Sequence, residues 1–263
     1  MSDMIKTALT VAGSDPSGGA GIQADIKTMQ ALGVYGMSVI TSLTAQNTMG
    51  VTGINDVPRD FLEAQINAVF EDIFPNAVKV GMVSSAELAQ VIADRLKYYG
   101  AKNIVVDPVM VSTSGSTLSK DDCIKKMEEK LFPLAALITP NIPEAERLWG
   151  KRIEDREDMQ NCAEELSQKY GCAVLLKGGH FEGGADDVLV HQKVIWLTGE
   201  RIDNPNTHGT GCTLSSAIAS YLARGESLEE AVKKAKDYLT GAIRAGLNLG
   251  KGRGPLDHAY RSR

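Results

Sequence analysis

The feature that most constrains how this chain can fold is a regular alternation of short apolar runs with amphipathic stretches. Each apolar run has the length and composition of a buried strand. The expected strands are Thr7–Ala12, Met37–Ala45, Ala77–Val80, Asn103–Val106, Ala135–Thr139 and Cys172–Leu176. Strands that alternate with helices in this way form a parallel-rich sheet that helices cover on both faces. We therefore expect an α/β fold.

The amphipathic stretches between these runs are expected to be helices. In Ile22–Leu32, for example, apolar residues recur along one side at helical spacing. The other expected helices are Pro58–Phe74, Ser84–Tyr99, Ser119–Leu131, Asp155–Tyr170, Gly211–Arg224 and Ser227–Leu249. The expected N-cap residues are Ser84, Ser119, Asp155 and Ser227. A hairpin-like pair, Asp186–Val190 with Val194–Leu197, and a C-terminal tail, Gly252–Arg263, complete the expected order.

The composition allows one large domain. With 263 residues, 43% of them hydrophobic, the chain can bury a sizeable core, and no repeat or linker divides it. We therefore expect a single domain over residues 1–263. The formal net charge is -5, and lysine and arginine are scattered without a basic run. Such a surface does not attract nucleic acids or anionic membranes, so neither is an expected partner.

The cysteines and the N-terminus point to the cytoplasm. Cys123, Cys162, Cys172 and Cys212 form no C-x-x-C pair and have no histidines at zinc spacing, so we expect free thiols in a reducing compartment. Residues 1–6 do not resemble the start of a signal peptide, and no run of 18 apolar residues occurs.

The strongest functional signal is the stretch from Asn206 to Ser216. Gly209 and Gly211 precede a run of good helix formers, which predicts a tight turn that opens a helix. Such a turn leaves backbone N–H groups unpaired at the positive end of the helix dipole, where a phosphoryl group would bind. Cys212 would stand beside it, and a helix N-terminus lowers a thiol pKa, so Cys212 could accept a proton from a substrate hydroxyl. The alternative is a glycine turn with a small buried thiol.

A second glycine-rich segment, Gly13–Gly21, connects the first expected strand to the first helix. It lacks the Gly-Lys-Ser/Thr of a phosphate-binding P-loop, and its glycine spacing does not fit a dinucleotide fingerprint. We expect this loop to close over a small substrate, with Asp25 on the following helix as a polar contact. A solvated helix charge is the alternative for Asp25.

Polar side chains collect just after the expected strands. Asp107 and Glu144 are acids in positions that suit Mg²⁺, which often uses few carboxylates together with substrate phosphates. Lys177, followed by two glycines, suits a contact to nucleotide phosphates, with a surface lysine as the alternative. Gln46 could read the edge of a heterocycle or cap a loop. Asp107, Glu144 and Lys177, together with Asn141 and the glycine turn before Cys212, should meet at the edge of the sheet where ligands bind.

These segments, taken in order, resemble the ribokinase superfamily and, within it, the hydroxymethylpyrimidine/phosphomethylpyrimidine kinases of thiamine biosynthesis. The resemblance runs nearly end to end, and its specificity comes from the order and combination of the motifs. They are residues 12–25, Leu43–Thr48, Asp107–Met110, Thr139–Asn141, Lys177–His180 and His208–Thr213. The segment Ser112–Leu118 departs from the glycine- and lysine-containing version expected in the family.

The resemblance implies a three-layer α/β/α fold and transfer of the γ-phosphoryl group of ATP to an alcohol. It implies that Cys212 is the base, where many sugar kinases of the superfamily have an aspartate. It further implies an anion hole, a pyrimidine pocket, magnesium-linked acids, nucleotide contacts and a homodimer. The residues implied are Gly209, Thr210, Gly211 and Cys212 for the anion hole; Gly13, Asp25, Gln46, Met82 and Val109 for the pocket; Asp107 and Glu144 for Mg²⁺; and Asn141 and Lys177 for the nucleotide.

Two other functions stay open from the sequence. A pyridoxal or pyridoxine kinase has the same fold, the same cysteine and a similar aromatic alcohol as substrate, and dual activity is an option. Gln46 favours the pyrimidine. A catalytically silent vitamin-binding protein is the alternative from a different class, because a fold alone does not establish activity.

Overall fold

A nine-stranded sheet forms the centre of the molecule. The structure is a computed structural model that describes residues 5–110, 119–179 and 185–262, so Ser112–Leu118 and His180 lie outside the described residues. The strand order is β3-β2-β1-β4-β5-β6-β7-β8-β9. The strands are β1 (Thr7–Ser14), β2 (Tyr35–Asn47), β3 (Gly50–Asp56), β4 (Ala77–Val80), β5 (Ile104–Val106), β6 (Leu137–Ile138), β7 (Ala173–Leu176), β8 (Asp187–His191) and β9 (Lys193–Leu197).

The middle of the sheet, from β2 to β7, is parallel, and its outer strands are antiparallel. Strand β3 pairs with β2 in the antiparallel sense at one edge, and β8 and β9 do so at the other. The central strands are buried on both faces, as the continuous apolar runs predict. The expectation of a mostly parallel sheet is confirmed.

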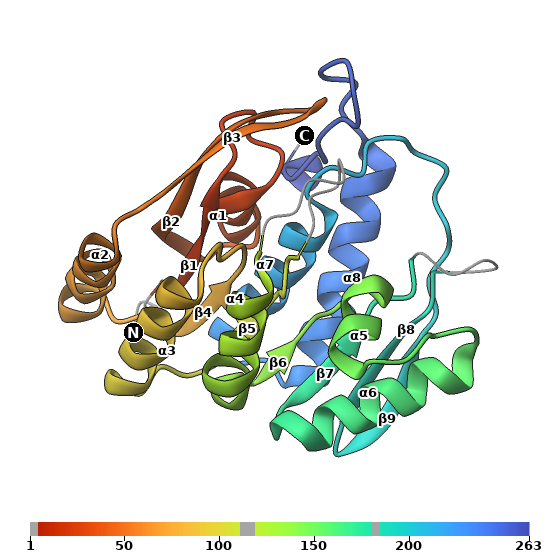
Figure 1. Ribbon diagram of the computed structural model, residues 1–263. Helices are drawn as coiled ribbons and strands as arrows, with labels where there is room; N and C mark the ends of the chain where they lie inside the picture. Colours follow the sequence, from red (N-terminus) through yellow and green to blue (C-terminus); the bar gives the residue numbers. More distant parts are fainter. Residues whose placement is uncertain (1–4, 111–118, 180–184, 263) are drawn as a thin grey trace.

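Helices cover both faces of the sheet, which gives three layers (Figure 1). One core packs α2 to α6 against the sheet, and the other packs α1, α7 and α8 against the opposite face. The helices are α1 (Gly21–Ala31), α2 (Arg59–Asp72), α3 (Ala86–Tyr98), α4 (Asp121–Lys126), α5 (Ile142–Trp149), α6 (Arg156–Tyr170), α7 (Thr210–Ala223) and α8 (Leu228–Ala245). No helix in the described part of the chain has the length and apolarity needed to cross a membrane.

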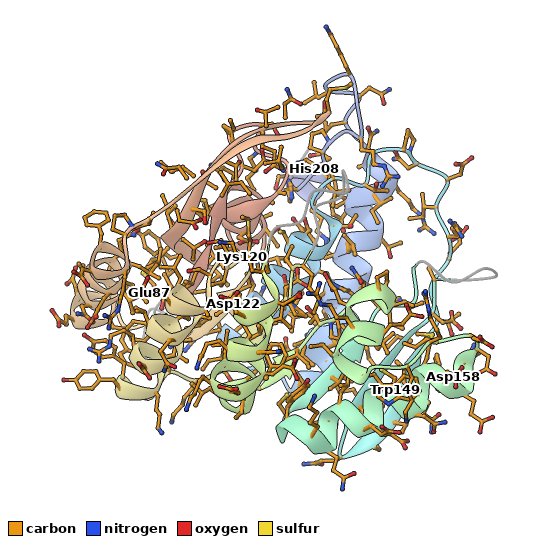
Figure 2. The ribbon with its side chains drawn as sticks, viewed as in Figure 1. Glu87, Lys120, Asp122, Trp149, Asp158 and His208 are labelled. Carbon is orange, nitrogen blue, oxygen red and sulfur yellow. The ribbon has the colours of Figure 1, made fainter. Side chains whose placement is uncertain are left out.

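Two of the expected N-caps are confirmed and two are wrong. Asp155 accepts from the Asp158 amide (2.8 Å), and Ser227 accepts from the Glu230 amide (3.4 Å). The cap of α3 is Ser85, whose hydroxyl accepts from the Leu88 amide, rather than Ser84. Ser119 does not cap α4, because its hydroxyl lies 2.7 Å from the carbonyl oxygen of Val83 and 2.8 Å from that of Val109. The backbone cap position of α4 is Lys120 (Figure 2).

The C-terminal segment is packed against the body of the protein, so the expectation of a tail is wrong. Helix α8 ends at Ala245, before the expected Leu249. Leu256 and His258 are buried. The hydroxyl of Tyr238 on α8 donates to the carbonyl oxygen of His258 (2.7 Å), and the side chains of His258 and Thr213 are hydrogen-bonded (3.0 Å). The segment therefore covers the start of α7.

Candidate functional site

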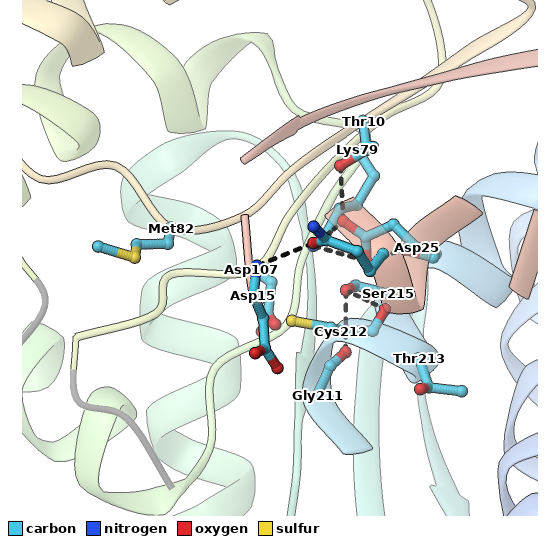
Figure 3. Close-up of polar contacts among 12 residues, drawn as sticks. Thr10, Asp15, Asp25, Lys79, Met82, Asp107, Gly211, Cys212, Thr213 and Ser215 are labelled. Atoms are coloured by element: carbon cyan, nitrogen blue, oxygen red, sulfur yellow. Dashed lines mark hydrogen bonds and ion pairs between the residues drawn. The ribbon is translucent and has the colours of Figure 1, made fainter. Parts of the chain in front are cut away.

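Asp107 lies at the carboxyl edge of the parallel strands, close to Gly211 and Cys212 in the first turn of α7 (Figure 3). Gly211, in that turn, lies close to both Asp107 and Lys177. A Cβ atom added to Gly211 would lie 3.2 Å from Asp107 Oδ2, after β5, and 3.7 Å from Lys177 Nζ, after β7. Parallel strands bring such residues together because all of their carboxyl ends lie at one edge.

The turn that opens α7 requires glycine at its cap. Gly209 has a φ of 84°, which favours glycine, and a Cβ atom there would lie 1.8 Å from the carbonyl oxygen of Gly19. The helix begins at Thr210, and the amides of its first turn have no acceptors within the helix. They lie at the positive end of the helix dipole. The turn can therefore bind an anion beside Asp107 and Lys177.

Asp107 and Lys177 form a buried ion pair. Lys177 Nζ donates to Asp107 Oδ1 (2.9 Å), and the Thr139 hydroxyl donates to the same oxygen (3.0 Å). The two side chains are 3% and 15% exposed. Burial disfavours the charge on Lys177, but the carboxylates of Asp107 and Glu144 outweigh it and raise the lysine pKa. Lys177 is therefore a fixed positive charge next to the turn, and not the surface lysine of the alternative reading.

Asn141 and Glu144 open α5, a helix that the sequence analysis did not predict. The Asn141 side chain accepts from the Glu144 amide (2.9 Å), and Glu144 Oε2 accepts from the Asn141 amide (2.8 Å), which together form a capping box. Both residues thus have a structural task. Burial, reinforced by the Asp107 charge, raises the pKa of Glu144 to about 7, although Lys177 opposes the rise.

The two acids fit a magnesium ion that keeps water and phosphate ligands. The charge of Asp107 contributes to the raised pKa of Glu144, and a cation near both carboxylates would oppose that rise. Among the described residues there is no group of three or more His, Cys, Asp or Glu that could hold a metal. Mg²⁺ sites that use one or two carboxylates plus substrate phosphates are common.

Cys212 lies in the first turn of α7, but the expected lowering of its pKa is wrong. Burial raises the pKa of the Cys212 thiol to about 11, and Asp25 and Asp107 contribute to the rise. The charge of Lys79 and a hydrogen bond from the Gly21 amide oppose it. Cys212 as a residue is of intermediate burial, whereas Cys123, Cys162 and Cys172 are buried.

The structure brings together some of the expected pocket residues. A Cβ atom on Gly13 would lie 3.1 Å from the Met82 sulfur, so these two residues are in contact. Gln46 lies on β2, where its Oε1 is 3.2 Å from the Thr44 hydroxyl oxygen. That hydroxyl donates to the Ser14 carbonyl oxygen (2.7 Å), which joins β2 to the end of β1. Val109 follows Asp107 and is partly exposed.

Asp25 does not contact the pocket as expected, because it is fully buried beneath the site. Both of its oxygens accept from Lys79 Nζ, at 3.0 Å and 2.8 Å. The hydroxyls of Thr10 and Ser216 also donate to it, each at 2.6 Å. The solvated helix charge of the alternative reading is equally wrong, since Asp25 is 0% exposed.

Sequence reasoning missed two buried pairs that support the site. One is Lys79 with Asp25, and the other is Asp15 with His208, whose Nε2 lies 2.7 Å from Asp15 Oδ2. A signal existed for the first: Lys79 stands between valines in an apolar strand, and lysine is almost never fully buried unless it is paired. The second pair spans 193 residues of sequence and leaves no local signal.

Comparison with known proteins gives one consistent family. Residues 15–257 match the family model described as phosphomethylpyrimidine kinase. A hydroxymethylpyrimidine/phosphomethylpyrimidine kinase of Rhizobium meliloti (strain 1021) is 50% identical over 263 residues, covering 98% of both chains. The thiamine biosynthesis bifunctional protein ThiED of Geobacter sulfurreducens is 52% identical over 254 residues, which are 96% of this chain and 52% of that protein. The chain therefore spans about half the length of the bifunctional relative.

Solved structures agree with this similarity. The crystal structure of phosphomethylpyrimidine kinase from Clostridium difficile 630 matches with a TM-score of 0.81 and 51% identity, covering 90% of this chain and 99% of that chain. An ADP complex of Bacillus subtilis pyridoxal kinase matches with a TM-score of 0.90 and 35% identity, covering 98% and 99%. These neighbours confirm the ribokinase-like three-layer α/β/α fold.

Proposed function

Because this chain belongs to the phosphomethylpyrimidine kinase family, we propose that it transfers the γ-phosphoryl group of ATP to 4-amino-5-hydroxymethyl-2-methylpyrimidine and then phosphorylates the monophosphate to the pyrophosphate in thiamine biosynthesis. The observation that carries this proposal is the position of the α7 turn. Gly211 sets the first turn of α7, with Cys212, against the Asp107–Lys177 pair. An anion site, a fixed cation and a proton acceptor thus stand together.

Phosphoryl transfer needs positioning and charge stabilisation more than covalent participation of the protein. The substrate oxygen bonds to the γ-phosphorus, the bond from that phosphorus to the bridging oxygen of ADP breaks, and the hydroxyl proton passes to the Cys212 sulfur. The amides of Gly209, Thr210, Gly211 and Cys212 stabilise the charge on the transferring oxygens. Mg²⁺, held through Asp107 and Glu144, would neutralise charge on the phosphates.

The binding roles follow the same geometry. Lys177 is charged and fixed, which suits a contact to the ATP phosphates. Asn141 lies next to Lys177 in an isolated parallel bridge beyond the ends of β6 and β7, so its side-chain amide can contact the nucleotide from the same side. Gly13, Met82, Val109 and Gln46 form the proposed pyrimidine pocket, in which Gln46 hydrogen-bonds to the ring edge. Asp25 acts from beneath this pocket.

Phosphorylation of pyridoxal is the second candidate function. The observation that favours it is the TM-score of 0.90 to the Staphylococcus aureus pyridoxal kinase in complex with AMP-PCP and pyridoxal, at 34% identity. The fold is shared between the two activities, so the side chains of the pocket decide between them.

The test is ADP release by the purified protein with Mg-ATP and three substrates in parallel: hydroxymethylpyrimidine, its monophosphate and pyridoxal. The mass of each product is determined, and a reaction without substrate corrects for ATP hydrolysis. We expect both pyrimidines to be turned over, giving the monophosphate and then the pyrophosphate. Turnover of pyridoxal alone would move the function to vitamin B6 salvage. Silence with all three would favour a vitamin-binding protein.

The proposed setting is a cytoplasmic homodimer. The described cysteines form no disulfide with one another, which suits a reducing compartment. The β2–β3 arm, residues 42–56, exposes Leu43, Met49 and Ile54 at the edge of the sheet. Exposed apolar side chains on an edge strand favour association with a second copy.

A further inference from the structure

Lys79 is a fully buried lysine in the centre of the sheet. In β4, Val78 and Val80 face the core that packs α2 to α6, while Ala77 faces the core of α1, α7 and α8. Because side chains alternate along a strand, Lys79 points to the same face as Ala77, toward α1 and α7. The Lys79 ammonium lies close to Gly81: a Cβ atom added to Gly81 would be 2.6 Å from Lys79 Nζ, so a larger residue there would collide with it.

Asp25 connects this lysine to the helix that carries the proposed base. Lys79 Nζ donates to both Asp25 oxygens, and the Ser216 hydroxyl donates to Asp25 Oδ1 (2.6 Å). Ser216 follows Cys212 by four residues on α7, so the two side chains lie on the same side of the helix, one turn apart. Asp25 thus ties β4 and α1 to the second turn of α7 (Figure 3).

The charges that face Cys212 come from several elements. Lys79 of β4 and Lys177, after β7, are the cations, and Asp25 of α1 and Asp107, after β5, are the anions. Burial disfavours the charge on Lys79, but Asp25, Cys212 and Asp107 outweigh it and raise the lysine pKa. Lys79 is therefore a permanent cation. It is also the side-chain charge that most opposes the raised pKa of the Cys212 thiol.

A contribution to stability does not by itself explain the buried Lys79–Asp25 pair. Replacement of a buried ion pair by well-packed apolar residues is often neutral or stabilising, because desolvation of both charges offsets their attraction. An apolar residue at position 79 would continue the pattern of Val78 and Val80. The placement of the pair under the first turns of α7 gives the lysine a task in the site.

We propose that Lys79 is a positioning residue of the phosphoryl-transfer site: through Asp25 and Ser216 its buried ammonium fixes the first turns of α7 and thereby sets the reactivity of the Cys212 sulfur. The role in turnover rests on the proposed function. The effect on the cysteine does not, because the thiol can be examined without substrate.

The experiment measures the rate at which iodoacetamide alkylates Cys212 across pH 7 to 10, by mass spectrometry of the peptide that contains it. The variants are Lys79→Met and the double variant Lys79→Met with Asp25→Asn, in which no buried charge stays unpaired. Lys234→Met, whose partner Glu226 lies on the surface away from the site, controls for net charge. Circular dichroism confirms folding.

We expect the rate to fall in a fixed order at pH 8. Lys79→Met should slow alkylation about tenfold, since one pKa unit changes the thiolate fraction tenfold. The double variant should slow alkylation only about threefold, because loss of the negative charge of Asp25 partly compensates for loss of the positive charge of Lys79. Lys234→Met should leave it unchanged. If the single variant fails to fold, the double variant carries the test.

Turnover gives a second, independent readout. In the double variant we expect kcat to fall about tenfold or more with KM for ATP nearly unchanged, because the pair acts on the base and not on the nucleotide. A folded double variant with wild-type alkylation at every pH would overturn the proposal. If the wild-type protein proved inactive on all substrates while the alkylation order held, the function would be wrong and the role of Lys79 would stand.

Discussion

As the proposed base, Cys212 would accept a proton although burial, with Asp25 and Asp107, raises its pKa to about 11. At neutral pH only a small fraction of the sulfur is the thiolate that acts as a base. As long as the pH is below the pKa, each rise of one pH unit increases the thiolate fraction about tenfold. We therefore expect kcat to rise about tenfold per pH unit between pH 7 and 9, measured with saturating Mg-ATP and pyrimidine.

The matched variant for this prediction is Cys212→Ala. Removal of a general base costs about 10²- to 10⁴-fold in rate, so turnover should fall by that range and lose its pH dependence. Calorimetry should show nearly unchanged affinity for the pyrimidine. Full turnover in Cys212→Ala, or a flat wild-type profile over this pH range, would mean that another group accepts the proton.

The location of a single residue was predictable from the sequence where its place relative to a strand determined which residues surround it. Asp107 and Lys177 follow strands of a parallel sheet, and such residues have to meet at its carboxyl edge. Asp25 was misplaced because a carboxylate early in a helix has the same sequence pattern whether it faces solvent, a pocket or the core. Its partner Lys79 lies 54 residues away, and only the tertiary structure brings the two together.

Between elements, a hydrogen-bonded latch joins the glycine-rich loop after β1 to the turn before α7. Asp15 accepts from the amides of Gly19 (3.2 Å) and Ala20 (2.8 Å), and its Oδ2 lies 2.7 Å from His208 Nε2. Burial alone would raise the Asp15 pKa, but these bonds and those of Ser17 lower it to about 2. The stabilisation is therefore complete above pH 4 and is lost only as the pH falls toward 2.

Breaking this latch should loosen the anion hole. We expect His208→Ala to cost about 1–3 kcal/mol of unfolding free energy, because the buried Asp15 loses a partner. It should also lower kcat by about tenfold, because Gly209, the next residue, packs against Gly19. His208→Gln keeps a donor and should recover part of both losses. Urea unfolding and steady-state kinetics measure the two effects.

The control for the latch is His191→Ala, since His191 is exposed at the end of β8. It should change neither stability nor kcat. If His208→Ala were destabilised but turned over substrate at the wild-type rate, the latch would serve only the fold and the glycine-rich loop would not position the anion hole.

Long apolar or strongly amphipathic elements were predictable, and short or polar ones were not. Strand β3 was missed because it is a largely exposed edge strand, Gly50–Asp56, with few apolar residues. Helix α5 was missed because Asn141 and Glu144 were interpreted only as ligand-binding residues, although the same pair is a capping box. The C-terminal segment was taken as a tail because its burial depends on contacts with α7 and α8 that no local pattern encodes.

At the scale of the whole molecule, the β2–β3 arm connects the proposed pocket to the proposed dimer. Gln46 lies on this arm, and its neighbour Thr44 hydrogen-bonds to Ser14 at the start of the glycine-rich loop. At the tip, the Thr48 hydroxyl accepts from the amides of Lys251 and Gly252 (3.2 Å each). A second copy packed on the arm would therefore also hold Gln46 in place.

Sedimentation velocity tests this arrangement. We expect the protein to sediment as a dimer at micromolar concentration, and Met49→Asp with Ile54→Asp to shift it to a monomer, because these side chains are 64% and 42% exposed on the arm. Phe61→Asp is the matched control, since Phe61 is 61% exposed on α2. Because the arm carries Gln46, the monomeric variant should have a raised KM for the pyrimidine and an unchanged KM for ATP. A monomeric wild-type protein, or dissociation by Phe61→Asp alone, would place the interface elsewhere or remove it.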